Sequence, residues 1–119
     1  MKFMLLVFGE PRDLHLKSSE WIERMAGFMV RFDDELAENG ELVYSEVLEP
    51  ATSATLIEWM DGSTRVGRGA FNRADRPLSR YWVVTVPNED RALELAASVS
   101  TVIENAVEVR QVMEQSTVP

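Results

Sequence analysis

An arginine-rich segment carries the most distinctive chemistry in this chain. Positions 65 to 80 hold five of the twelve basic residues and a single acid, so the segment carries +4 and the remainder of the chain −12. A guanidinium group pairs with a carboxylate or phosphate through two parallel hydrogen bonds and keeps its charge at any working pH. The segment predicts a site for a small organic anion, but the same arginines would also suit acids of this chain or of a partner subunit, or stay solvated. The five are Arg65, Arg68, Arg73, Arg76 and Arg80, of which Arg68 and Arg73 are favoured because they bracket Phe71.

His15 is the only histidine and the natural candidate for proton transfer. An unperturbed imidazole has a pKa of about 6.5, which suits a general base at neutral pH. One hypothesis is therefore a lyase or isomerase without a cofactor, acting on an aromatic or carbonyl compound, in which His15 is the base and Arg68 or Arg73 stabilises developing negative charge. Because the sequence offers it no fixed partner, His15 is more simply interpreted as an ordinary loop side chain.

Other polar and aromatic groups have simpler interpretations. The acids Asp33, Asp34, Glu35 and Glu38 fall on one predicted helix, opposite its apolar stripe, and are expected on a solvated face rather than around a metal ion. Tyr81, Trp82 and Trp59 are candidates to stack on an aromatic ligand, although aromatic residues in strands more often belong to a core or an interface. There is no cysteine, no phosphate-binding glycine loop and no zinc-binding or dinucleotide motif, so we expect neither a metal nor a cofactor.

Length and charge set the outer limits. A chain of 119 residues, 45% hydrophobic and 27% charged, predicts one domain over positions 1–119. The net charge of −8 argues against nucleic acid as a partner. No apolar run approaches the roughly 20 residues of a membrane span. The apolar start ends at Gly9-Glu10-Pro11 without a cleavage site, so a cytoplasmic location is expected.

Hydrophobic periodicity predicts two helices, four single strands and one hairpin. Apolar residues recur at three and four between Ser18 and Asn39-Gly40, and again after Asn88, which predicts two capped helices. Short apolar runs predict the strands, and Asp61-Gly62 tolerates the backbone of a tight hairpin turn. The predicted strands are 2–8, 41–48, 55–60 with 64–66 as the hairpin, 81–86 and 106–113.

This order predicts an α+β protein with a ferredoxin-like βαββαβ plan and an extra hairpin. Crossover handedness places both helices on one face of an antiparallel sheet. The strand 81–86, Tyr-Trp-Val-Val-Thr-Val, is bulky and apolar at both parities, so both of its faces are expected to be dry. We therefore predict that a second copy covers the open face, giving a homodimer of the dimeric α/β barrel type.

Several segments resemble the YCII-related proteins, and in particular the branch named for an Asp-Gly-Pro-Phe (DGPF) motif. The similarity runs over nearly the whole chain and is most specific in the final stretch, Val-Glu-Val-Arg-x-Val-Met-Glu. The resemblance implies a ferredoxin-like dimer with a pocket near the named motif. The segments are 1–9, 69–71, 80–84, 92–97 and 107–114.

Two departures from this resemblance bear on catalysis. The named motif is replaced here by Arg68-Gly69-Ala70-Phe71, so an arginine stands in place of the aspartate. A histidine of related proteins, about eleven residues before the glycine that ends the first helix, is replaced by Met29. We therefore lean against an enzyme and predict a small homodimer that binds an organic acid near the Arg68–Phe71 loop. Its ligand-binding residues would be Arg68, Phe71, Arg73 and Tyr81, with His15 the one candidate for catalysis; a purely structural dimer is the third hypothesis.

Overall fold

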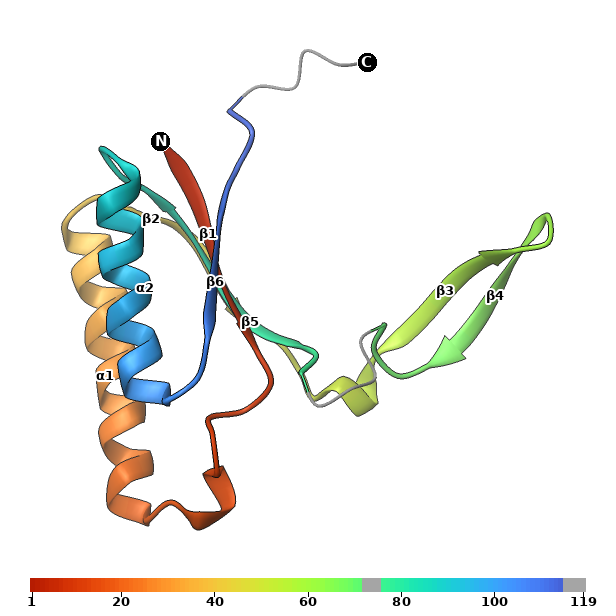
Figure 1. The fold of residues 1–119 in the computed structure, drawn as a ribbon, viewed down its shortest axis with the longest axis horizontal. Coiled ribbons are helices and arrows are strands. Elements are labelled where there is room, and N and C mark those ends of the chain that lie inside the picture. Colours follow the sequence, from red (N-terminus) through yellow and green to blue (C-terminus); the bar gives the residue numbers. More distant parts are fainter. Residues whose placement is uncertain (72–75, 115–119) are drawn as a thin grey trace.

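The computed structural model describes residues 1–71 and 76–114. In this part of the chain, two helices pack on a four-stranded antiparallel sheet and a separate two-stranded sheet projects from it (Figure 1). The α+β class predicted from the sequence is confirmed, and the arrangement is compatible with a ferredoxin-like fold. The strands are β1 (Lys2–Phe8), β2 (Leu42–Val47), β3 (Thr55–Met60), β4 (Ser63–Arg68), β5 (Leu78–Thr85) and β6 (Val107–Gln111), and the helices are α1 (Ser19–Glu38) and α2 (Glu89–Ile103).

The main sheet has the strand order β2-β5-β1-β6, so β1 and β5 occupy its centre. Leu5 lies opposite Trp82 and Phe3 opposite Val84, on the face that the helices cover. Met4 opposite Val83 and Leu6 opposite Tyr81 lie on the other face. Because side chains alternate along a strand, the helices bury only one of these two sets.

Local sequence explains where the helices begin and end. The Ser18 side chain accepts a hydrogen bond from the Trp21 backbone N–H, and the Asn88 side chain accepts one from that of Arg91. These caps satisfy backbone donors that an uncapped first turn would leave free. Helix α1 ends before Gly40, whose φ of 70° suits a glycine.

The core lies between the helices and the covered face of the sheet. Trp82 is fully buried and meets Phe32 of α1 edge to face, with ring centroids 5.4 Å apart. Leu36 of α1 and Val99 of α2 are also almost completely buried. No described helix is both long and apolar enough to cross a membrane.

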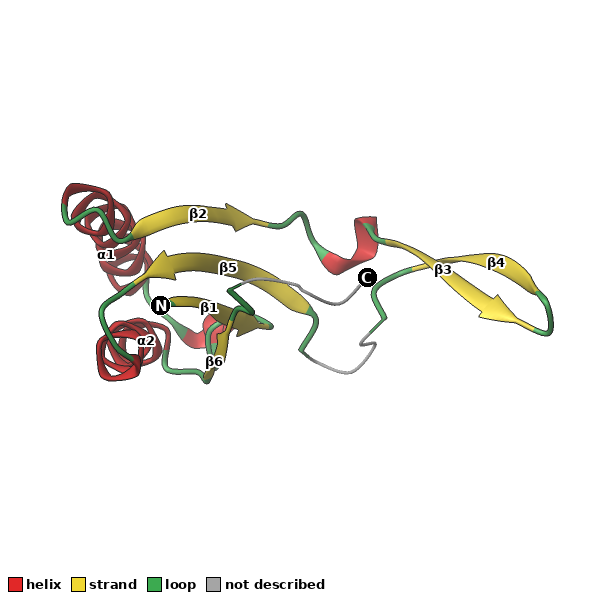
Figure 2. Cartoon of the chain, turned by 90° about the horizontal axis from the view of Figure 1, so that it is seen from above, coloured by secondary structure: helices red, strands yellow, loops and turns green. Residues whose placement is uncertain are grey.

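Strands β3 and β4 form the predicted hairpin, which we call the arm. Asp61 and Gly62 make its turn with φ values of 50° and 85°, as expected for the Asp-Gly pair. The base is closed by the Gly69 N–H, which donates to the Ala54 carbonyl at 2.8 Å. The arm pairs with no described strand of the main sheet and extends well away from it (Figure 2).

The arginine-rich segment does not form the one loop that its closeness along the chain suggests. Arg65 and Arg68 lie on β4, at the arm, whereas Arg80 lies on β5 in the main sheet. Strand β5 begins at Leu78, three residues earlier than predicted, because Leu78 pairs with Phe8 past an irregularity in the register of β1. The segment thus distributes its guanidinium groups over two separate parts of the fold.

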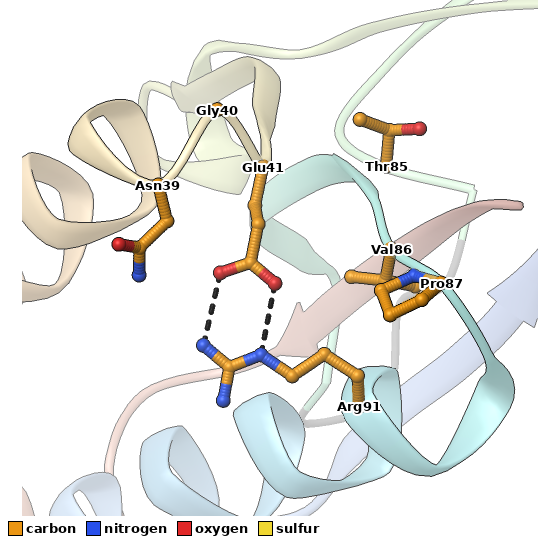
Figure 3. A pocket seen from close by; sticks show the side chains of 7 residues that line it. All are labelled: Asn39, Gly40, Glu41, Thr85, Val86, Pro87 and Arg91. Atoms are coloured by element: carbon orange, nitrogen blue, oxygen red, sulfur yellow. Dashed lines mark hydrogen bonds and ion pairs between the residues drawn. The ribbon is translucent and has the colours of Figure 1, made fainter.

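An ion pair fastens α2 to the start of β2. Figure 3 shows Arg91 and Glu41 pointing toward each other across a shallow surface depression. Arg91 Nε donates to one oxygen of Glu41 at 2.8 Å and Nη2 donates to the other at 2.9 Å, while Nη1 donates to Glu94. The hydrogen bonds from Arg91 lower the pKa of Glu41 below its ordinary value. The charges and hydrogen bonds of Arg91 and Glu41 are paired with each other, so we assign this depression a structural role and do not treat it as a ligand site.

We predict that Glu41→Gln destabilises the protein by about 1 kcal/mol at pH 7, a modest figure because the pair is partly solvated. The folded-state pKa of Glu41 is lowered, so its contribution is fully present above the ordinary pKa of 4.5 and is lost as the pH falls through the folded value. Urea unfolding of both proteins between pH 3 and pH 7 measures this. An equal stability difference at pH 3 and pH 7 would contradict the prediction.

Candidate functional site

A cavity of about 730 Å³ opens where β1 and β2 end and β5 begins. Its apolar wall comes from Met25 and Met29 of α1, together with Val7 and Ile103. The connection that follows β1, residues 9–13, forms part of its rim. We call this space the Arg80 cavity, because Arg80 is the charged residue held deepest in its lining.

Arg80 enters the cavity because of its parity in β5. It lies opposite Val7 and two residues before Trp82, so its side chain shares the helix-covered face with them. The guanidinium carbon lies 4.7 Å from the centre of the Trp82 ring, and Nη2 lies 3.4 Å from an Asp33 oxygen. Arg80 Nε is buried and has no hydrogen-bond partner within residues 1–71 and 76–114. Burial lowers the pKa of Arg80, although the neighbouring Asp33 carboxylate opposes this effect.

Asp33 of α1 positions this arginine. One of its oxygens accepts a hydrogen bond from the Trp82 indole N–H at 2.7 Å, while the other faces Arg80. The expectation that Asp33 sits on a solvated face is therefore wrong, whereas Asp34 and Glu35 are exposed as predicted. The spacing contained the signal: Asp33 follows Met29 by four residues and precedes Leu36 by three, so it shares their inward face.

The other charged groups of the lining lie at the mouth. Glu10, Arg12, Asp13, Glu49 and Arg76 are all exposed, with both signs represented, so water and salt screen them. Arg80 is different, since its side chain is only 21% exposed. A negative ligand group that reached this depth would therefore interact with Arg80 more strongly than with the rim.

The strand ends around the cavity are fixed by hydrogen bonds. The buried Asn105 donates to the Glu10 carbonyl at 2.8 Å and accepts from the Ala106 N–H, which ties the end of α2 to the connection after β1. The Ser79 hydroxyl donates toward the carbonyls of Val7 and Gly9, at 3.0 and 2.9 Å. These contacts hold Arg80 on a rigid frame.

A second depression, of about 470 Å³, lies at the base of the arm and shares a wall with the Arg80 cavity. The segment Gly69–Phe71 lines it, facing apolar residues that include Phe8 and Leu56. Its common wall with the Arg80 cavity is formed by residues 48–51 together with Pro77 and Leu78.

The structure separates the ligand-binding residues predicted from the sequence. Arg68 is exposed at the end of β4, and Phe71, also exposed, lines the depression at the base of the arm. Tyr81 lies on the opposite face of the sheet from Arg80, with its ring 6.1 Å from that of Tyr44. Arg73 falls outside the described residues. His15 is exposed in a short 3₁₀ helix, Leu14–Leu16, and is not among the residues lining either space.

Met29, which stands where the resemblance places a histidine, lies in the wall of the Arg80 cavity. It is buried, contributes to the core and lines the Arg80 cavity. Its thioether gives this wall a flexible apolar surface and cannot transfer a proton. Among the described residues there is no group of three or more histidine or acidic side chains suited to a metal ion.

Comparison with known proteins gives one result. The family model of the YCII-related domain matches residues 1–116, nearly the whole chain. No curated protein matches the sequence.

We predict that Asp33→Asn destabilises the fold by about 1–2 kcal/mol, because it removes the carboxylate that pairs with Arg80 among the described residues and leaves this cation without that compensation. Partial solvation of the pair keeps the figure below that of a fully buried one. The asparagine carbonyl retains an acceptor for Trp82, so the loss reports mainly on the charge.

Urea unfolding of Asp33→Asn, Arg80→Met and the double variant measures this coupling. The double variant should be more stable than Asp33→Asn alone, since it no longer holds an unpaired cation. Strictly additive losses would show that Asp33 and Arg80 do not interact.

Proposed function

The chain belongs to the YCII-related family, and we propose that it is a small homodimeric binding protein of the Asp-Gly-Pro-Phe branch that holds an organic acid. The ligand would occupy the Arg80 cavity and extend toward the adjoining depression at Phe71. This keeps the proposed site near the segment Arg68–Phe71 and moves its anchoring charge to Arg80.

One observation carries the proposal: a largely buried guanidinium lines a partly apolar cavity, and among the described residues Asp33 is the carboxylate that faces it. Asp33 engages one edge of the group and the Trp82 ring covers one side, while Nε is buried without a hydrogen-bond partner in the part of the chain that the structure describes. A carboxylate would accept from Nε in a setting where water screens the interaction weakly. The neighbouring side chains, including Met25 and Met29, would hold an apolar ligand body.

The geometry favours binding over the enzyme hypothesis. That hypothesis required His15 as a base beside an arginine, and His15 lies outside the lining of the Arg80 cavity. The position at which the resemblance places a histidine is occupied here by Met29, within the cavity wall. The wall therefore offers a ligand charge pairing and apolar contact in place of proton transfer.

Dimerisation accounts for the open face of the sheet. Met4, Leu6, Tyr81 and Val83 lie together on this face and do not belong to the core cluster beneath the helices. Leu6 is already buried, whereas the other three are half-buried. Completing the burial of one such side chain contributes up to roughly 1.5–3 kcal/mol. A second copy presents the same surface, so two open faces meeting around a two-fold axis would form a shared interior.

We predict that the wild-type protein raises its melting temperature in the presence of an aromatic monocarboxylate such as benzoate at millimolar concentration. A ligand that binds only the folded form stabilises it. Arg80→Met should weaken the apparent affinity at least tenfold, since it removes the anchoring charge. A thermal-shift titration, with acetate and neutral benzamide for comparison, measures both effects.

Arg68→Met is the matched control, because it removes the same charge from the exposed end of β4. It should leave the benzoate response unchanged. Loss of the response in Arg68→Met but not in Arg80→Met would place the anchor at the arm instead. If neither benzoate nor a wider panel of organic acids shifts the melting temperature, the binding function is wrong.

The dimer has a separate test. Sedimentation velocity at micromolar concentration should give twice the 13.5 kDa mass of one chain. Val83→Glu should convert the dimer to a folded monomer, because the half-buried position lets a long side chain place its charge in water in one chain but not between two sheets. An undiminished dimer in Val83→Glu would exclude the open face as the interface.

A further inference from the structure

The arm is amphipathic, and its apolar face is exposed to solvent. Ile57 lies directly opposite Val66, and Trp59 opposite Thr64, so these side chains share one face of the hairpin. Their exposed fractions are 65% for Ile57, 74% for Val66 and 72% for Trp59. The other face carries the opposed charges of Glu58 and Arg65. Such a pattern is typical of a hairpin with one side packed against another surface.

An isolated two-stranded hairpin is only marginally stable in water. The arm nevertheless extends so far that the radius of gyration is 16.6 Å, compared with roughly 13.5 Å for a compact chain of this length. The main sheet and the helices of the same chain cover little of the arm. An exposed apolar β-surface of this kind usually marks an interaction site.

The direction of the arm indicates what covers it. In Figure 1 the helices lie to one side of the main sheet and the arm leaves on the other side, and Figure 2 shows the same order along the same axis. The arm therefore stands beside the open face that carries Met4, Leu6, Tyr81 and Val83. A molecule seated on this face lies next to the arm.

Charge is also compatible with a second copy in that position. The arm, residues 55–68, contains two acids and two arginines, so the rest of the chain carries the whole net charge of −8. Two such bodies repel each other. The arm is the projecting part of the chain that can approach an acidic body without adding to this repulsion, and its arginines can pair with surface acids.

We propose that the arm of each subunit packs its Ile57–Trp59–Val66 face against a second copy of this chain, so that two arms clasp the dimer. The proposal rests on the homodimer proposed above and adds a contact that the open face alone does not provide. Because Phe71 and the depression at the base of the arm lie next to this contact, the clasp also fixes one wall beside the ligand cavity.

The area involved suits a stable dimer. Trp59 alone exposes on the order of 150 Å² at its measured exposure, and Ile57 and Val66 roughly double this. Two arms and the surfaces they cover would bury about 1,200 Å², the lower end of stable interfaces, before the sheet faces contribute.

Removal of the arm provides the test. Ala54 and Gly69 are already hydrogen-bonded at its base, so an Asn-Gly turn can replace residues 55–68 without stretching the chain. Sedimentation equilibrium over a concentration series should give the shortened chain a dimer dissociation constant at least ten times that of the wild type. Circular dichroism checks that it is folded.

A point variant keeps the proposal testable if the shortened chain does not fold. Trp59→Thr removes the largest side chain of the apolar face while retaining a strand-forming residue, and it should also weaken the dimer. Glu58→Thr is the matched control on the adjacent position and opposite face, and should leave the dimer unchanged.

The outcomes separate the clasp from the dimer itself. A wild-type dimer weakened by Trp59→Thr or by arm removal, but not by Glu58→Thr, supports the clasp. A wild-type dimer that is equally tight without the arm overturns the clasp and leaves the homodimer standing. A wild-type protein that is monomeric at every concentration overturns both.

Discussion

One-sided coverage of the main sheet is the constraint on which the rest of the structure depends. Helices α1 and α2 fill the space over one face, where Trp82 and Leu5 are fully buried. The helices do not cover the other face, where the central strands carry the buried Leu6 and the half-buried Tyr81 and Val83. The fold therefore separates a core between helices and sheet from a second apolar face, which in the proposed dimer would be covered by another copy.

The same alternation of side chains creates the candidate site. A strand that places Trp82 and Val84 under the helices must also place Arg80 there, near the end where the helix layer no longer fills the space. A charge in this position requires compensation, which Asp33 supplies from α1. The cavity thus forms where the sheet extends beyond the helix layer. Its chemistry follows from Arg80, the charged residue that the alternation of β5 places on the inner face.

The sequence predicted the elements well and the tertiary positions of charges poorly. Strand β1 agrees with its predicted bounds, and the Asp61-Gly62 turn lies where the dipeptide indicated, because local backbone preferences decide these features. Grouping Arg80 with Arg68 failed, since closeness along the chain says little once a strand begins between them. Asp33 was assigned to solvent although its spacing from Met29 and Leu36 placed it inward. Which acid meets which arginine depends on the packing of α1 on β5, and one sequence does not specify this.

The charge distribution is compatible with the anionic ligand proposed for this acidic protein. A net charge of −8 disfavours the approach of an anion at long range, but salt reduces this field over roughly 8–10 Å. At the rim of the cavity, the electric fields of the exposed positive and negative groups largely cancel. Deeper in the cavity, Arg80 lies in a poorly solvated setting, where its charge is screened less. In the proposed function, the ligand would offer a carboxylate to the guanidinium and an apolar body to Met25 and Met29. Highly charged anions lose more hydration than one arginine returns, so the proposed site would favour a single negative charge on an otherwise hydrophobic molecule.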